Sequence, residues 1–245
     1  MKAMILAAGL GTRLRPMTDS RPKALVEVSG RTLLEITLGR LRDSGVSEVI
    51  VNVHHLADMI SDYLKAKNNF GMRIEISREE VLLDTGGGLR KAAWFFLDDP
   101  NRLDEPFILH NVDVLSAIDL RRMVEFHTQN QALATLAVKK RETSRYLLFD
   151  EHNQLCGRRS SPDQKTELVR FAKKLQPLAF SGIQVLSPRL LPMMAEEGVF
   201  SIINSYLNLA ARGQKILAFR ADEYYWRDLG RPEHLIQAAT DLMTI

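Results

Sequence analysis

The sequence predicts an α/β protein with a Rossmann-like, doubly wound and mostly parallel sheet that carries a small antiparallel insertion. Through the first half of the chain, short apolar runs alternate with amphipathic stretches, the pattern of strand–helix–strand units. After Asp113 the apolar runs follow one another without room for long helices, which predicts antiparallel strands. A single domain over residues 1–245 is the simplest organisation, since the sequence has neither an internal repeat nor a low-complexity linker.

The individual elements follow from the same periodicities. Strands are expected over residues 2–7, 48–53, 72–77, 107–111, 132–138, 146–150, 154–158, 178–186, 215–220 and 224–227. Helices are expected over residues 33–44, 57–66, 85–97, 120–129 and 200–212, with a last helix after Pro232. The antiparallel insertion corresponds to the three consecutive strands between residues 132 and 158.

Composition and charge exclude several classes of protein. The 245 residues are 45% hydrophobic, enough for a substantial core, but no apolar run approaches the roughly 18 residues that a membrane-spanning helix needs. The N-terminal MKAMILAAG has neither a basic lead nor a cleavage site, so we expect a cytoplasmic protein with no membrane partner. The net charge of +3 is spread along the chain, which argues against a nucleic-acid partner.

The first apolar run leads directly into a glycine-rich loop. Gly9, Gly11 and Arg13 follow the first expected strand, and Pro22-Lys23 comes shortly after. Glycines at the carboxyl end of a first parallel strand let the backbone approach a ligand, and free N–H groups there bind phosphate oxygens. A tight strand-to-helix turn is the plain alternative, but the added Thr-Arg and Pro-Lys favour a phosphate-binding loop. The third glycine of the dinucleotide fingerprint is missing, which argues against a dinucleotide-dependent oxidoreductase.

Asp113 is the second candidate site residue. It follows the strand expected over residues 107–111, at the sheet edge where open parallel sheets bind their ligands. If this strand neighbours the first one, the carboxylate faces the glycine-rich loop. A helix N-cap is the alternative role, but Asp119 is the better cap for the helix expected over residues 120–129.

The run LAAGLGTRLRPMT, followed by PKAL, resembles the signature of the sugar-phosphate nucleotidyltransferase family, and the resemblance extends over nearly the whole chain. It implies the nucleotide-diphospho-sugar transferase fold and Mg²⁺-dependent transfer of a nucleoside monophosphate from a nucleoside triphosphate to a sugar 1-phosphate, with release of pyrophosphate. By this resemblance the loop wraps the triphosphate, and the catalytic residues are Arg13, Lys23 and Asp113. Fixed cations suit this reaction, since charge builds on the phosphate oxygens. The implied nucleotide-binding residues here are Leu6, Ala7, Ala8, Gly9, Gly11, Thr12, Arg13 and Lys23.

The same resemblance implies a metal site formed by Asp113 and Asp228. Val112 stands where the family has the glycine of a Gly-Asp pair. The segment Trp226-Arg227-Asp228-Leu229-Gly230-Arg231-Pro232 resembles the family's Trp-x-Asp-Ile-Gly-Thr-Pro. Two carboxylates with phosphate oxygens and water form the oxygen-only, near-octahedral shell that Mg²⁺ prefers.

Two further segments are implied to contact the substrates. Thr85, Gly86 and Gly87 open the helix expected over residues 85–97 and would face the nucleobase, with Asn111 as a further nucleotide contact; a helix cap is the alternative role of Thr85. On the sugar side, Ala-Phe-Ser-Gly-Ile resembles a family strand that lies beneath the sugar. The implied substrate residues are Ser181, Gly182, Asn204 and Asp228. The cation for the acceptor phosphate stays open among Arg158, Arg159 and Lys174.

The short chain, the Thr-Gly-Gly-Gly segment and the Asn-x-Asp most resemble the N-acetylmuramate-1-phosphate uridylyltransferase-like members of the family. UTP and N-acetylmuramate 1-phosphate, or a related hexose or heptose 1-phosphate, are therefore the expected partners. Residues 1–130 would bind the nucleotide and residues 131–245 the sugar phosphate. A phosphocholine cytidylyltransferase and a catalytically inactive sugar-nucleotide-binding regulator are the alternatives. The sequence leaves a monomer and a homodimer both open.

Overall fold

The computed structural model describes residues 1–161 and 165–241. Its helices are α1 (Leu33–Asp43), α2 (Ala57–Ala66), α3 (Asp84–Lys91), α4 (Ala93–Phe96), α5 (Leu120–Gln129), α6 (Ile202–Ala211) and α7 (Pro232–Asp241). The strands of the first half are β1 (Lys2–Leu6), β2 (Glu27–Val28), β3 (Arg31–Thr32), β4 (Glu48–Val53), β5 (Arg73–Arg78), β6 (Phe107–Asn111) and β7 (Val114–Ser116). Those of the second half are β8 (Ala134–Lys139), β9 (Arg145–Phe149), β10 (Leu155–Ser160), β11 (Lys165–Leu168), β12 (Gln176–Leu186), β13 (Ile216–Arg220) and β14 (Trp226–Asp228).

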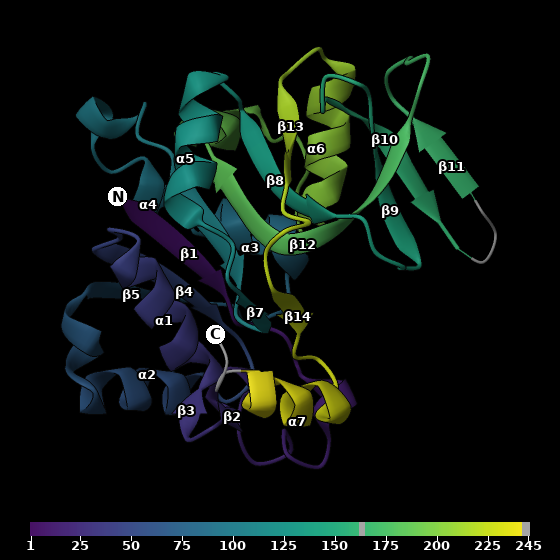
Figure 1. Cartoon of the computed structure of the whole chain (residues 1–245). Helices are drawn as coiled ribbons and strands as arrows, with labels where there is room; N and C mark the ends of the chain where they lie inside the picture. The colour runs from purple at the N-terminus through teal and green to yellow at the C-terminus, as the bar shows by residue number, and fades with distance from the viewer. Residues whose placement is uncertain (162–164, 242–245) are drawn as a thin grey trace.

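The central sheet is mixed and mostly parallel in its first half, as the sequence predicts. Strands β5, β4, β1 and β6 lie side by side in parallel, in that order, and β12 joins β6 in antiparallel orientation. The long β12 also pairs with β8 and with β9, so it connects the parallel half to the second half of the chain. Of the expected antiparallel insertion, β9 and β10 pair with each other, and β11, which the sequence did not predict, pairs with β10; these three strands project from the body as an arm (Figure 1). The remaining strand of the expected insertion, β8, instead lies in the central sheet, where it pairs with β12 and β13.

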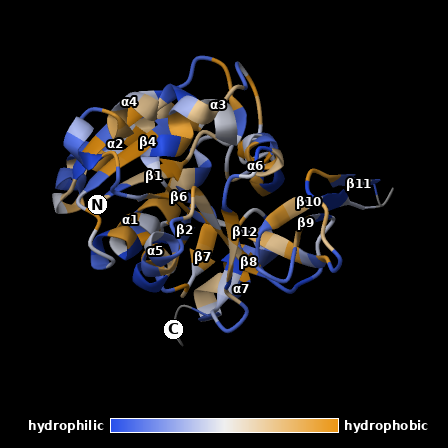
Figure 2. Ribbon diagram, turned by 90° about the horizontal axis from the view of Figure 1, so that it is seen from above, coloured by the Kyte–Doolittle hydropathy of each residue, from blue (hydrophilic) through white to orange (hydrophobic). Residues whose placement is uncertain are grey.

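Helices cover both faces of the sheet. Along β1, Ala3 and Ile5 belong to a core shared with α1, α2, α5 and α7, whereas Met4 between them belongs to a second core with α3, α4 and α6. This alternation is the period of two that a strand buried on both faces requires. Figure 2 shows α3 and α6 on one side of the sheet and α1 and α5 on the other. Within the described ranges, none of the helices combines the length and the apolar character that crossing a bilayer demands.

One expected helix is divided in two. The sequence predicts a continuous helix over residues 85–97, but the structure has α3 and α4, which meet at Ala92 with φ −85° and ψ 2°. The turn directs Phe95 and Phe96 into the second core, where both are buried. Packing of these two aromatic side chains therefore outweighs the continuity of the helix.

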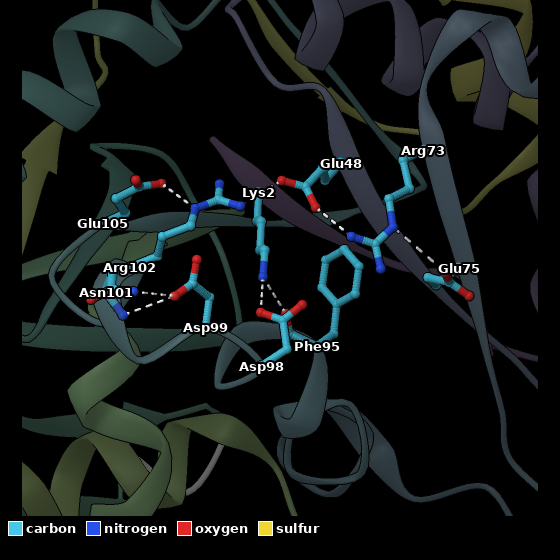
Figure 3. A network of polar contacts seen from close by, with 10 residues as sticks. All are labelled: Lys2, Glu48, Arg73, Glu75, Phe95, Asp98, Asp99, Asn101, Arg102 and Glu105. Carbon is cyan, nitrogen blue, oxygen red and sulfur yellow. Dashed lines mark hydrogen bonds and ion pairs between the residues drawn. The ribbon is translucent and has the colours of Figure 1, made fainter.

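An ion-pair network fastens the edge of the sheet where β1 and β4 begin (Figure 3). Lys2, which is buried, pairs with Asp98 beyond α4. Glu48 accepts from Arg73 at 2.9 Å and from Arg102 at 2.7 Å. These contacts fix the segment between α4 and β6 and leave the opposite edge, where β1 and β6 end, for ligand binding.

Candidate active site

A cavity of about 490 Å³ opens at the carboxyl ends of β1 and β6. Its wall contains most of the nucleotide-binding residues predicted from the sequence. These are Leu6, Ala7, Ala8, Gly9, Gly11, Thr12, Arg13, Lys23, Thr85 and Asn111. Asp113 and Gly230 also line it. The structure thus brings the glycine-rich loop, the end of β6 and the segment after β14 together around one space, the nucleotide cavity.

The two loop glycines serve different purposes. Gly11 has φ +66°, and a Cβ there would lie 2.9 Å from Thr18 Cγ2, so a side chain would be both strained and crowded. Thr18 Oγ1 donates to the Gly11 carbonyl at 2.9 Å and closes the turn. Gly9 is exposed, and a Cβ added to it would meet no atom within 4 Å. Gly11 therefore shapes the loop, whereas Gly9 leaves the cavity open.

Lys23 and Asp113 form an ion pair inside this cavity. Lys23 begins a short 3-10 turn after Pro22 and is only 8% exposed. Asp113 comes directly after Val112 at the end of β6, and the parallel pairing of β6 with β1 brings it opposite the loop. The doubly wound order predicted this placement. The two opposite charges neutralise each other.

Asp228 lies on the strand next to Asp113. Strand β14 pairs antiparallel with β7 so that Asp228 is opposite Val114, and the Leu229 amide donates to the Asp113 carbonyl at 2.7 Å. A Cβ at Gly230 would lie 2.5 Å from Arg13 Nη2 and 2.8 Å from Asp228 Oδ1. Gly230 therefore leaves room for the Arg13 guanidinium and the Asp228 carboxylate beside its backbone.

The donor set fits a hard divalent cation that is shared with substrate. Nowhere in residues 1–161 and 165–241 do three or more His, Cys, Asp or Glu side chains gather closely enough to hold a metal ion. A cation between Asp113 and Asp228 would thus need oxygens from phosphate and water to complete its shell, as Mg²⁺ commonly does. Asp228 Oδ1 already accepts from the Gly230 amide at 2.9 Å, which fixes the carboxylate and leaves its second oxygen.

The glycines at the start of α3 are placed differently from the expectation. Gly86 and Gly87 are buried and do not line the nucleotide cavity, and both of their amides donate to the Phe200 carbonyl, at 2.9 and 3.3 Å. A Cβ at Gly86 would lie 2.3 Å from the Phe200 ring, and one at Gly87 the same 2.3 Å from the Gly198 carbonyl oxygen. Close packing against residues 198–200 accounts for these glycines. Thr85 caps α6 instead of its own helix, since its Oγ1 accepts from the Ile202 amide at 3.0 Å.

Two buried polar residues of the nucleotide cavity were not predicted. Asn52 on β4 and Glu79 after β5 line it, and each is 2% exposed. Both stand at the carboxyl ends of parallel strands, the same position that singles out Asp113. That rule, applied to every expected strand, would have found them.

A second cavity of about 1210 Å³, the sugar cavity, meets the nucleotide cavity at Arg13, which lines both. It lies against the β9–β11 arm and β14. Its basic residues are Arg13, Arg141, Arg145, Arg158, Arg159, Lys165, Arg227 and Arg231, and its acidic residues are Glu142, Glu167 and Asp228. Arg158 and Arg159 line this cavity, whereas Lys174 does not. The cavity is therefore suited to an anionic ligand.

Arg141 is the best-held cation of the sugar cavity and was not predicted. Its guanidinium carbon lies 4.2 Å from the Trp226 ring centroid, and Nη2 donates to the Phe180 carbonyl at 2.9 Å. Burial lowers the pKa of Arg141, and the negative charge of Asp228 opposes that shift. Its Nε is buried without a partner among the described residues, so a donor is left for a ligand. Arg141 follows the carboxyl end of β8, the one sequence signal that marks it.

The predicted sugar contacts lie just outside this cavity. Ser181 is fully buried, and its hydroxyl has no partner among the described residues. Gly182 has φ +73° and lets β12 approach Asn111, since a Cβ would lie 2.9 Å from the Asn111 Nδ2. Asn204 accepts from Arg158 Nη1 at 2.9 Å, so it supports a cation of the cavity. Of the predicted substrate residues, only Asp228 lines the sugar cavity.

The consecutive aromatic residues Tyr224, Tyr225 and Trp226 do not form a cage for the quaternary ammonium group of phosphocholine. Tyr224 stacks on Phe219, and Tyr225 bonds through its hydroxyl to Asp241. Only Trp226 faces the sugar cavity, and Arg141 already covers its ring. The cation–π contact that choline would need at that ring is taken by the protein.

Comparisons with known proteins agree with this arrangement. A family model described as Nucleotidyl transferase matches residues 2–244. An N-acetylmuramate alpha-1-phosphate uridylyltransferase of Caulobacter vibrioides is 34% identical over 252 residues, covering 98% of this chain and 96% of that protein. A mannose-1-phosphate guanyltransferase of Yarrowia lipolytica is 30% identical over 244 residues, covering 96% of this chain and 62% of that protein.

Solved structures share the fold. HddC from Yersinia pseudotuberculosis complexed with GMP-PN superposes with a TM-score of 0.75 at 22% identity, covering 98% of this chain and 99% of that one. A UDP-glucose pyrophosphorylase complexed with UDP-glucose gives a TM-score of 0.78 at 18% identity, covering 99% of this chain and 98% of that one. The family match over almost the whole length, together with the identity to the uridylyltransferase, is decisive. The chain belongs to the nucleotidyl transferase family and is a sugar-1-phosphate nucleotidyltransferase.

Proposed function

We propose that the protein transfers a uridylyl group from UTP to N-acetylmuramate 1-phosphate, or to a related sugar 1-phosphate with a second anionic group, and releases pyrophosphate. The observation that carries the proposal is the meeting of the nucleotide cavity and the sugar cavity at Arg13. One guanidinium there reaches a phosphate group of each substrate. The 34% identity to the uridylyltransferase of Caulobacter vibrioides supports the choice of UTP and of the amino sugar.

In the proposed reaction, an oxygen of the sugar phosphate attacks the α-phosphorus of UTP, and the bond from that phosphorus to the pyrophosphate breaks. The acceptor phosphate is already ionised at neutral pH, so the chain needs no general base. Arg13 would bind two phosphate oxygens through its planar fork, and Lys23 would leave Asp113 to bind the triphosphate. Asp113 and Asp228 would hold Mg²⁺, which neutralises phosphate charge and aligns the reacting groups when bound.

In this proposal each half of the chain binds mainly one of the two substrates. Residues 1–130 supply the phosphate-binding loop and the wall that contains Thr85, and residues 131–245 supply most of the sugar cavity. Val199 and Gly230 from the second half also line the nucleotide cavity, and Arg13 from the first half lines the sugar cavity. Val199 is 62% exposed and offers an apolar surface for the uracil ring.

Charge in the sugar cavity supports an acceptor with two anionic groups. Glu167 neutralises Arg158, and Asp241 neutralises Arg227. Within the described part of the chain, several other cations of the cavity form no ion pair: Arg13, Arg141, Arg145, Arg159 and Lys165. N-acetylmuramate 1-phosphate carries a lactyl carboxylate besides its phosphate, so it would neutralise more of this positive charge than mannose 1-phosphate, which carries the phosphate alone.

A matrix of nucleotides and acceptors tests the proposal through release of pyrophosphate with Mg²⁺. The nucleotides are UTP, GTP, CTP and dTTP, and the acceptors are N-acetylmuramate, N-acetylglucosamine, mannose and glucose 1-phosphates and phosphocholine. N-acetylglucosamine 1-phosphate is the matched control, because it lacks only the lactyl group. We expect the highest kcat/KM for UTP with N-acetylmuramate 1-phosphate and a value about 100-fold lower for the control, the effect of one lost charge-assisted hydrogen bond. Preference for GTP with mannose 1-phosphate, or no pyrophosphate from any pair, would overturn it.

A further inference from the structure

Asn52 and Glu79 connect the two walls of the nucleotide cavity through a chain of hydrogen bonds. Asn52 Oδ1 accepts from the Ala7 amide at 2.7 Å, and Asn52 Nδ2 donates to Glu79 Oε1 at 2.6 Å. Glu79 Oε2 accepts from the Leu83 amide at 2.9 Å. Ala7 begins the glycine-rich loop, and Leu83 lies at the start of α3. The chain therefore runs from the phosphate side of the cavity to the opposite wall.

We propose that Asn52 and Glu79 are positioning residues that fix the separation of these two walls for the nucleotide. The inference rests on the proposed nucleotide site. Each amide donor that the pair holds belongs to a segment that lines the cavity, since Ala7 itself and Leu82 both do. A phosphate loop that is held in place before binding does not have to be ordered by the ligand, which improves binding and catalysis.

The burial and close packing of Asn52 and Glu79 indicate that these side chains serve to position the cavity walls. Glu79 is 2% exposed, and among the described residues no Lys, Arg or His forms an ion pair with it. A carboxylate buried in this way is costly unless its hydrogen bonds compensate. The third glycine of the tract also matches the pair, because a Cβ at Gly88 would lie 2.7 Å from both Asn52 Nδ2 and Glu79 Oε1. The helix start is thus shaped to admit these two side chains.

The direction of each hydrogen bond predicts how isosteric substitutions act. The Ala7 and Leu83 amides can only donate, so each needs an acceptor facing it. In Glu79→Gln, the new NH₂ group faces either Asn52 Nδ2 or the Leu83 amide, and either orientation sets two donors against each other. In Asn52→Asp, two carboxylates face each other, and the hydrogen bond between the side chains is lost while both are ionised.

Combining the two substitutions restores every contact. In the double variant Asn52→Asp/Glu79→Gln, the new aspartate accepts from Ala7 with one oxygen and from the new glutamine NH₂ with the other. The glutamine oxygen then accepts from Leu83. The net charge equals that of the wild type, and only the direction of the central hydrogen bond is reversed.

The test compares wild type, both single variants and the double variant in steady-state kinetics. We expect each single variant to raise KM for UTP about tenfold, the cost of one buried unpaired group, with KM for the sugar phosphate close to wild type. The double variant should return KM for UTP to within about threefold of wild type. Glu48→Gln, on the same strand β4 but in the network at the other sheet edge, is the control and should leave both KM values unchanged.

Single variants that match the wild type would overturn the positioning role. So would a double variant as impaired as the worse single one, since a Glu79 that contacts the nucleotide directly is not restored by the reversal. If Asn52→Asp does not fold, the comparison of Glu79→Gln with the double variant decides. Calorimetric titration of all four proteins with UTP and Mg²⁺, without sugar phosphate, separates this inference from the proposed function, because it tests the nucleotide cavity alone.

Discussion

The Arg141 side chain is held by its neighbours in an orientation that suits the binding of an anion. It lies over Trp226 and donates to the Phe180 carbonyl, and its buried Nε has no hydrogen-bond partner among the residues that the structure describes. The ring and the carbonyl restrict the guanidinium to one orientation, so little conformational entropy remains to be lost on binding. We infer that this arginine binds the acceptor.

Replacing Arg141 with Gln should therefore weaken the acceptor and spare the nucleotide. We expect KM for the sugar phosphate to rise by about 10- to 100-fold, the effect of losing a hydrogen bond to a charged group, while KM for UTP stays close to wild type. Arg141→Lys should recover part of the loss, because it restores the charge without the planar fork. Arg122→Gln, which removes an exposed ion pair with Glu223, is the control. An equal rise in both KM values would contradict the assignment.

The glycine-rich loop and helix α3 both contain glycines, but for different reasons. One substitution in each segment can distinguish these reasons. Gly9 faces the nucleotide cavity, and a Cβ there meets no protein atom within 4 Å. Gly87 is buried against the Gly198 carbonyl, with 2.3 Å available for a Cβ. Gly9 in the loop therefore leaves space for a ligand, whereas Gly87 in the helix allows close packing against the Gly198 carbonyl.

Gly9→Ala should leave the melting temperature unchanged and raise KM for UTP, because the methyl group occupies space beside the phosphates. Gly87→Ala should instead destabilise the fold by about 1–3 kcal/mol, the usual cost of overpacking. Thermal unfolding and steady-state kinetics on both variants check the pair. A destabilised Gly9→Ala protein with normal kinetics would show that the loop glycine has a packing role.

The sequence predicts a helix or strand correctly where apolar residues recur with a regular period. It misses a strand that forms only through pairing with its neighbour. Helices α2 and α5 have the predicted bounds, because each has a clear apolar face. Strand β11 (Lys165–Leu168) is exposed at all four positions and was not predicted, since its pairing with β10 leaves no apolar signal. For the site, the glycine-rich loop and Asp113 could be placed from order along the chain. The strand-end position also marks Asn52 and Arg141, but their roles could not be predicted, because these depend on partners distant in sequence.

At the scale of the whole molecule, the network in Figure 3 holds the sheet edge opposite the active site. The hydrogen bond and charge of Lys2 lower the pKa of Asp98 below its ordinary value of 3.8, against the opposing effect of burial. Burial would raise the pKa of Glu48, but Arg102, Lys2 and Arg73 together outweigh it and lower that pKa. Both carboxylates therefore stabilise the fold in their ionised form.

The sign of the pH dependence follows. A carboxyl whose pKa is lower in the folded state contributes stability above its unfolded value, and this contribution is lost as the pH falls through the folded pKa. Asp98→Asn should thus lower the melting temperature at pH 7. The difference in melting temperature between this variant and the wild type should disappear below about pH 4. Asp104→Asn, in the same exposed segment, is the control. A difference in melting temperature that is the same at pH 7 and pH 3 would rule out this ionic contribution.

We infer that Asp113 and Asp228 hold one divalent cation where the nucleotide and sugar cavities meet. The most direct test measures pyrophosphate release with the best substrate pair for wild type, Asp113→Asn, Asp228→Asn and the distant control Glu48→Gln, each with Mg²⁺ and with EDTA. We expect EDTA to abolish the activity, each aspartate substitution to lower kcat by at least about 100-fold, and the control to remain active. Full activity in either aspartate variant, or activity that persists in EDTA, would show that Asp113 and Asp228 do not hold a catalytic cation.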